Sequence, residues 1–280
     1  MGIFGISLAV IAGLCLIVSA VGANDSPAPD KEPASAMASP YVMAWSAPVG
    51  SGWEIFFSRY MADGWAPAIQ VSVNGNLNLV PTVVADKEDT LWLFWSSQEK
   101  GQFLLYHARV QADDITESEV DTEQLTNNMA PSALIDESRT LWLVWSGFDG
   151  SDDDIFFSKL EDSRWSSPRR VNQDDDSPDI QPLIGLDTDG IPWVVWRGFD
   201  NGTYRFFFSK WNGRAWENEK TLENNHPYLQ QIRTQLEALP DMPDEVDQPI
   251  KGSIHASGAP IQSIPLFMQP LLSETDADSQ

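Results

Sequence analysis

The tryptophans of this chain recur at a regular interval. Trp45, Trp95, Trp145 and Trp196 are spaced by 50, 50 and 51 residues. Ten residues after each of them a second apolar motif begins, at 55–58 (IFFS), 105–108 (LYHA), 155–158 (IFFS) and 206–209 (FFFS). Matched spacings of this kind indicate tandem repeats of about 50 residues, and each repeat is then one supersecondary unit that packs against its neighbours.

The third repeat shows most clearly that each unit contains four β-strands. Pro131 opens a first strand at 131–135 (PSALI), and a polar turn leads to a second at 141–145 (LWLVW). A third strand lies at 155–158, and a fourth, polar one around 165–171 contains Pro168. The second and third strands are apolar on both faces, which predicts burial on both sides. A proline suits the outer edge of a sheet, because no backbone donor is needed there.

These features predict an all-β fold, a β-propeller of about four four-stranded blades. Residues 33–37 could form the inner strand of the first blade, or a C-terminal segment could supply it. The ring could close within one chain, or a second chain could complete it as a homo-oligomer.

The two ends of the chain differ from the repeats. Residues 3–21 are nearly all apolar and precede Val21-Gly22-Ala23, which predicts a signal peptide at 1–23. The first basic residue is Lys31, so an uncleaved N-terminal anchor stays open as an alternative. Either interpretation places the body outside the cytoplasm, as a secreted, periplasmic or cell-surface protein.

The remaining segments follow from composition and periodicity. Residues 24–32 are expected to form a linker, 33–225 the repeat domain, and 226–280 a C-terminal extension. Within this extension, apolar residues at helical spacing predict a short helix over 228–239. The tail from Pro240 is rich in proline and is expected to be irregular, although 261–272 is apolar enough to pack onto the body.

The net charge of −24, from 41 acidic and 17 basic side chains, limits the partners. Such a surface repels nucleic acid and anionic membranes, whereas it suits cations, basic proteins and neutral ligands such as sugars. Cys15, the only cysteine, lies in the N-terminal apolar segment. The body therefore has no disulfide, cysteine metal site or cysteine nucleophile.

The third repeat resembles a known family through PSALIDESRTLWLVWSG at 131–147, DIFFSK at 154–159 and WSSP at 165–168. It is similar to the blade repeats of sialidase-like (BNR or Asp-box) β-propellers and their non-catalytic or lectin-like members, over about 33–223. No Asp-box is intact, and DTDGIPW at 187–193 comes nearest. The arginines do not recur at matched positions, so the resemblance carries over no catalytic residue.

The function that these observations favour is an exported, non-catalytic binding module that recognises a glycan or a protein through its loop face. The alternatives are a divergent glycan-active enzyme, such as a sialidase-like glycosidase or lyase, and a structural component of an envelope or matrix. The balance leans away from an enzyme, but the sequence leaves the question open.

Four residues that break the repeat pattern are candidate ligand contacts. Trp53 and Trp211 are expected near loops and could stack on a sugar ring, whereas the matched tryptophans are expected in the core. Arg197 replaces the serine of the other repeats and could bind a carboxylate or sugar hydroxyls, or pair with Asp200. His107 replaces a phenylalanine and could contact a ligand or lie buried with a hydrogen bond.

Two acidic loops are candidate ligands for Ca²⁺, because this cation binds clusters of carboxylates. Both connect strands at the same end of the third repeat, so their side chains are expected on one face. The alternative is that the loops are simply solvated. The residues are Asp149, Asp152, Asp153, Asp154, Asp174, Asp175 and Asp176. No other cofactor is expected.

Overall fold

The computed structural model describes residues 41–161, 163–223, 225–239 and 252–265. The predicted signal peptide, the linker and the candidate strand at 33–37 lie outside the described residues. Among the residues described, no helix is long and apolar enough to cross a membrane.

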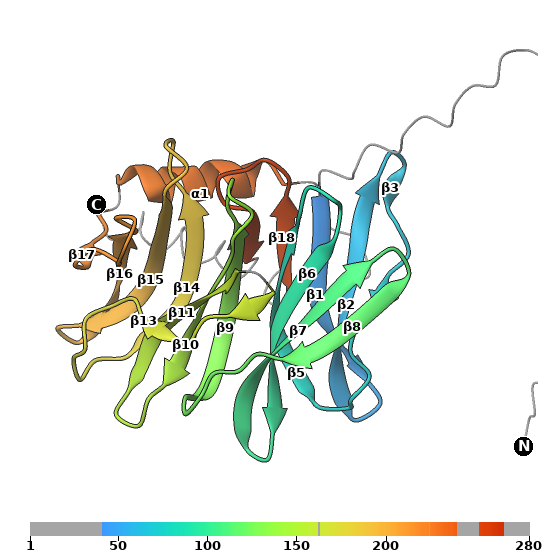
Figure 1. Cartoon of the computed structure of the whole chain (residues 1–280), viewed down its shortest axis with the longest axis horizontal. Coiled ribbons are helices and arrows are strands. Elements are labelled where there is room, and N and C mark those ends of the chain that lie inside the picture. The colour runs from blue at the N-terminus through green and yellow to red at the C-terminus, as the bar shows by residue number, and fades with distance from the viewer. Residues whose placement is uncertain (1–40, 162, 224, 240–251, 266–280) are drawn as a thin grey trace, which may run out of the picture. The chain divides into compact units, whose positions relative to one another are not determined.

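The chain is all-β and forms four antiparallel meanders that lie side by side (Figure 1). Meander 1 contains β1 (Tyr41–Val49), β2 (Gly52–Met61), β3 (Gly64–Trp65) and β4 (Ile69–Gln70). Meander 2 contains β5 (Leu77–Ala85), β6 (Leu91–Glu99), β7 (Gln102–Gln111) and β8 (Asp114–Glu119). Meander 3 contains β9 (Thr126–Ile135), β10 (Leu141–Phe148), β11 (Asp153–Glu161), β12 (Arg164–Trp165) and β13 (Arg169–Arg170). Meander 4 contains β14 (Asp179–Leu186), β15 (Pro192–Asp200), β16 (Thr203–Lys210) and β17 (Lys220–Thr221).

Hydrogen bonding groups these strands into three sheets instead of four. Meanders 1 and 2 share one ten-stranded sheet, because a parallel pairing of Trp53 with Leu77 joins β2 to β5. The outer strands of meanders 1 and 3 are each divided into two short pieces. Pro168 lies between the two pieces of meander 3, where no ladder hydrogen bond is required.

The C-terminal extension adds α1 (Pro227–Glu237), β18 (Gly252–Ala256) and β19 (Ser263–Pro265). The helix is the predicted one. β18 pairs antiparallel with β1, with Ala44 opposite Ser253, and β19 pairs with β18. The C-terminal segment therefore supplies the inner strand of meander 1. The prediction of an irregular tail is wrong for these residues, because the open edge of β1 offers them backbone partners.

The predicted core tryptophans pack between neighbouring meanders. Trp95, Trp145, Trp193 and Trp196 are at most 1% exposed, and Trp142 is 2% exposed. Apolar clusters join each meander to the next, and the last cluster joins meander 4 to α1. Burial on both faces is therefore confirmed for β6, β10, β11 and β15. It is wrong for β7 and β16, the third strands of meanders 2 and 4, which are largely half-buried or exposed.

An aspartate begins the turn between the first two strands of three meanders. Asp86 Oδ1 accepts hydrogen bonds from the amides of Glu88 and Thr90, at 3.0 and 2.8 Å. Asp136 and Asp187 accept from their own turns in the same way. Such local bonds stabilise a tight turn, so these repeated aspartates have a structural role.

Candidate ligand-binding groove

A groove of about 1190 Å³ lies at the end of the molecule that carries the β5–β6, β9–β10 and β14–β15 turns. This is the upper end in Figure 1. The turn between β18 and β19 forms another part of its wall. The acidic loops proposed to bind calcium lie at the opposite, lower end, whereas His107, one of the four candidate ligand contacts, lines this groove. Its volume lies slightly above the roughly 300–1,000 Å³ of typical small-molecule sites.

One side of the groove is lined by a leucine at the position where the next repeat has a tryptophan. In meander 4, Lys210 pairs with Trp193, and Trp211 is the next residue along the chain. Trp211 packs on Trp142 of meander 3, with ring centroids 5.2 Å apart. The equivalent residue in meander 3 is Leu160, which lines the groove beside Trp92 of meander 2. The smaller side chain leaves space that Trp211 fills at the next interface.

Three rings and a guanidinium form one wall of the groove. The ring of His107 lies between Trp92 and Trp165, at centroid distances of 5.8 and 6.1 Å. Arg109 lies over Trp92, with Cζ 6.0 Å from the ring centroid. Trp92 and Trp165 are half-buried. Aromatic side chains of this kind combine an apolar face with a polar edge, which suits ligands that have both.

Trp92 differs from its two equivalents in the other repeats. Trp142 is covered by Trp211 and Trp216, whereas Trp193 stacks on Tyr228 of α1 at 4.5 Å. Of these three equivalent tryptophans, Trp92 is therefore the one that contributes to the groove instead of lying wholly in the core.

Two histidines line the groove. Burial lowers the pKa of His107, and it lowers the pKa of His255 to about 4. The Nδ1 atoms of both have no hydrogen-bond partner among the residues that the structure describes. Neutral imidazoles can either donate or accept at these positions. For His107, the expectation of a hydrogen bond is thus not met at Nδ1, and its role as a ligand contact stays a prediction.

Three carboxylates at the turns of the groove are already engaged. Asp136 Oδ2 accepts from Trp142 Nε1 at 2.9 Å, and Asp187 pairs with Lys210 at 2.5 Å. Asp89 pairs with Arg59 at 2.7 Å. The groups left for a ligand are therefore mainly the rings, the guanidinium of Arg109 and the exposed side chains of Lys87 and Glu137.

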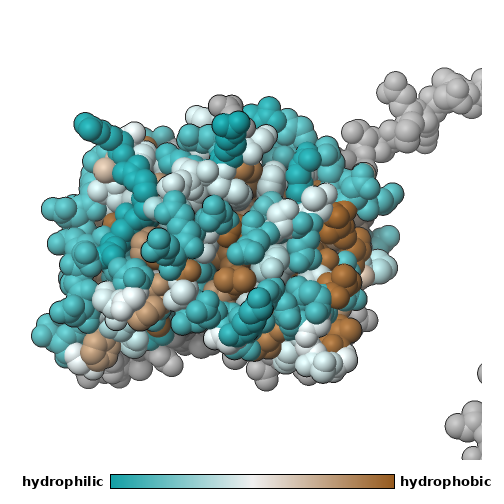
Figure 2. Space-filling view, turned by 60° about the horizontal axis from the view of Figure 1, so that its bottom comes forward, coloured by the Kyte–Doolittle hydropathy of each residue, from teal (hydrophilic) through white to brown (hydrophobic). Residues whose placement is uncertain are grey.

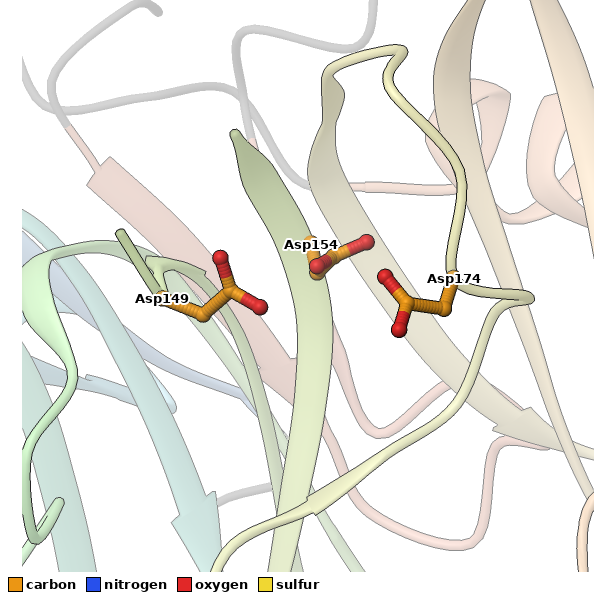
Figure 3. Close-up of side chains that lie close together, drawn as sticks. All are labelled: Asp149, Asp154 and Asp174. Carbon is orange, nitrogen blue, oxygen red and sulfur yellow. The ribbon is translucent and has the colours of Figure 1, made fainter. Parts of the chain in front are cut away.

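At the opposite end, three of the seven candidate calcium ligands converge (Figure 3). One oxygen each of Asp149, Asp154 and Asp174 lies within 4.8 Å of the others. Arg170 pairs with all three, at 2.5 Å to Asp149 and 3.2 Å to Asp154. The guanidinium thus supplies the positive charge that a cation would bring.

The other four candidates do not join this cluster. Asp152 and Asp153 lie in the β10–β11 turn and at the start of β11, whereas Asp175 and Asp176 are exposed in the loop after β13.

Asp154 of this cluster shares a donor with a second buried carboxyl group, Asp179. Nδ2 of Asn172 lies 2.6 Å from Asp154 Oδ1 and 2.5 Å from Asp179 Oδ2. Burial raises the pKa of Asp154 to about 6 and that of Asp179 to about 7. Both groups are inside the protein, because Asp154 is fully buried and Asp179 nearly so.

The remaining candidates lie apart from one another. Trp211 is 9% exposed and packs among Trp142, Phe157 and Trp216, so the prediction that it stacks on a ligand is wrong. Trp53 is half-buried in β2 beside the β1–β2 turn.

Among the residues that the structure describes, Arg197 forms no ion pair with a carboxylate, Asp200 included. Its Nη1 lies 3.3 Å from Gln181 Oε1, and its Cζ lies 4.9 Å from the ring centroid of Tyr204. Asp200 pairs instead with Arg205, at 3.3 Å. Pairing with Asp200, which the sequence suggested, is therefore wrong.

Neither the models of known protein families nor the curated proteins match this sequence. Among solved structures, a protein of unknown function from Dyadobacter fermentans DSM 18053 is similar, with TM-score 0.53 and 11% identity over 65% of each chain. An α-L-arabinanase from Penicillium chrysogenum gives TM-score 0.48 and 16% identity over 64% of this chain and 62% of its own. An ulvan lyase gives TM-score 0.47 and 10% identity, covering 67% of this chain and 56% of its own. The chain thus spans less than two thirds of the length of each of these structures. Identities this low show a likeness of fold alone, and membership of the sialidase-like family stays a prediction.

The sequence did not single out Trp92 and Trp165 as groove residues, because both occupy repeated positions that usually form core. Differences between the repeats could nevertheless have indicated the groove. Lys159-Leu160 in meander 3 aligns with Lys210-Trp211 in meander 4, and His107 aligns with Phe157. Both replacements lie at the interface between meanders 2 and 3.

Proposed function

We propose that this chain is an exported, non-catalytic carbohydrate-binding module. The four meanders are four blades of a β-propeller-like domain, and β18 is the inner strand of the first blade. The ligand binds in the groove at the upper end. The observation that carries this proposal is the wall formed by Trp92, His107 and Trp165, which opens where Leu160 replaces a tryptophan.

The chemistry of this wall fits a sugar. A pyranose has apolar C–H faces that pack on indole rings and hydroxyl groups that hydrogen-bond at its rim. Arg109 supplies a polar contact beside the rings. A neutral ligand is also favoured by the net charge of −24, because anions are repelled from such a surface.

The alternatives fit this groove less well. The carboxyl groups with the most strongly raised pKa values, Asp154 and Asp179, are buried and do not line it. A glycosidase places such a pair on either side of the scissile bond. An assembly surface would be flat and apolar, whereas this face is concave and mixed in polarity.

The experiment compares binding to a panel of neutral and acidic oligosaccharides by titration calorimetry. Leu160→Trp copies the residue of the next repeat and is expected to fill the groove, lowering affinity by at least about tenfold with little change in melting temperature. Leu160→Ala, the matched control, keeps the groove open and is expected to retain binding. Undiminished binding by Leu160→Trp would place the ligand elsewhere, and no binding to any glycan would contradict the proposed function.

The oligomeric state is a separate part of the proposal. Since β18 of the same chain supplies the inner strand of meander 1, that strand does not require a second copy. Light scattering of the purified protein is expected to give the mass of a monomer. A stable dimer would instead support completion of the ring by a second chain.

A further inference from the structure

A second, smaller pocket lies at the lower end of the molecule, away from the groove. Its volume is about 380 Å³, and it is formed by meanders 2, 3 and 4. Figure 2 turns this end toward the viewer and shows a mainly hydrophilic surface with separate hydrophobic areas. The apolar residues that line the pocket are Val80, Met129, Ala130, Phe148 and Ile180, and the polar ones are Asn127, Ser146, Asp153 and Gln181.

Three strained residues form part of this pocket. Val80, Ala130 and Gln181 occupy the same position in three successive inner strands, each directly before a proline. Their φ angles are 51°, 51° and 55°, in the left-handed region that non-glycine residues rarely adopt. The pairing register shifts at each of these positions, as at a β-bulge. Bulges and strained backbone concentrate at functional sites, and here they fix the shape of the pocket in advance.

Among the described residues that line the pocket, Asp153 is the only ionisable one. It is half-buried, and burial together with the nearby Asp152 raises its pKa. None of the basic side chains that the structure describes forms an ion pair with it, whereas Arg170 neutralises Asp149 and Asp154 next to it. The pocket therefore combines apolar walls with one carboxylate that lacks a counter-charge.

One basic residue, Arg197, lies close to the pocket, because it pairs with Ile180 between neighbouring strands. Arg197 reaches the pocket residue Gln181 but lies over the ring of Tyr204. It does not itself line the pocket. The charge that Asp153 presents is thus available to a ligand, and Phe148 beside it offers an aromatic ring that can contact a cation.

We propose that this pocket binds a small organic cation, a primary ammonium or guanidinium group on an apolar body about the size of a side chain. The cation pairs with Asp153, and the apolar body packs on Met129, Phe148 and Ile180. The strongly acidic surface raises the local concentration of such cations. This site is independent of the glycan groove, because the two lie at opposite ends of the meanders and share no residue.

The test uses benzylamine as the probe and benzyl alcohol as its neutral counterpart, with binding followed by calorimetry on the full chain. Benzylamine is expected to bind saturably, and at least about tenfold more tightly than benzyl alcohol. Asp153→Asn is expected to remove most of this preference. Asp152→Asn is the matched control: it removes one neighbouring charge but does not change the pocket wall. Thermal melting of both variants verifies folding.

Several outcomes would overturn the proposal. Equal binding of benzylamine and benzyl alcohol would show that only apolar contacts matter. If Asp152→Asn and Asp153→Asn lost the preference for benzylamine equally, the overall negative charge would attract the cation and Asp153 would not form a specific site. A lysine-rich peptide that binds while benzylamine does not would show a protein partner. Leu160→Trp is expected to leave benzylamine binding unchanged, so the two proposals can fail separately.

Discussion

The indole nitrogen of Trp145 donates a hydrogen bond of 2.9 Å to Oδ1 of Asn128, and both side chains are fully buried. The pair is separated by 17 residues, and Trp95 makes the same bond to Asn78 at 3.0 Å. In the last repeat the acceptor position, 17 residues before Trp196, holds Asp179. A neutral amide is thus replaced by an ionisable group at a buried position.

This replacement predicts a pH-dependent stability. The pKa of Asp179 is about 7 in the folded state, against about 3.9 for an unfolded aspartate. Between these values the folded state binds more protons, so stability falls as the pH rises from about 4 to about 7. Asp154, with a pKa of about 6, adds to the same slope.

Asp179→Asn restores the amide of the other repeats. We expect it to raise the free energy of unfolding at pH 8 by roughly 1–3 kcal/mol, with little effect at pH 4. Urea denaturation at several pH values measures the change. Asp189→Asn, in an exposed turn, is the control and is expected to leave the slope as it is. An unchanged slope in Asp179→Asn would assign the pH dependence to other groups.

Substitutions of two tryptophans, one in the core and one in the groove, are expected to have different effects. Trp145 is fully buried, so Trp145→Ala is expected to cost about 3–5 kcal/mol of folding free energy. Trp92 is half-buried, and Trp92→Ala is expected to cost less and to weaken glycan binding. Chemical denaturation and calorimetry measure the two effects. A near-native stability of Trp145→Ala would contradict its place in the core.

The calcium hypothesis leads to a test on Arg170. Because this guanidinium pairs with Asp149, Asp154 and Asp174, we expect calcium to change the melting temperature of the native protein very little. Arg170→Gln leaves three carboxylates within 4.8 Å without their counter-charge. This variant is expected to be less stable and to regain stability when calcium is added. A strong calcium response of the native protein, unchanged in the variant, would place the ion elsewhere.

The pairing of β18 with β1 can be tested at Gly252. A Cβ atom at this position would lie 2.4 Å from the carbonyl oxygen of Ala44, which is closer than packed atoms allow. Gly252→Ala is therefore expected to cost about 1–3 kcal/mol, since β18 must shift away from β1. Ser257→Ala, in the exposed turn after β18, serves as the control in the same thermal melts. Equal melting temperatures would show that β18 contributes little to the fold.

The repeats themselves could be predicted from the sequence because they depend on local patterns. The interval between the tryptophans and the apolar runs determined the strands, the burial of Trp95, Trp145 and Trp196, and the all-β class. Helical spacing likewise determined α1. These properties follow from side-chain period and hydrophobicity, which each segment carries on its own.

The site depended on packing between segments that are distant in the sequence. Leu160 and Trp211 are equivalent in the repeat, yet only their neighbours decide that one leaves a groove and the other fills it. Arg170 contacts three aspartates because β13 lies beside β11. β18 pairs with β1 although more than half of the chain separates them in the sequence. The sequence alone therefore determined which strands form and which side chains are buried in them. Only the tertiary structure decided where space and unpaired charge remain, because both depend on how unlike neighbours fit together.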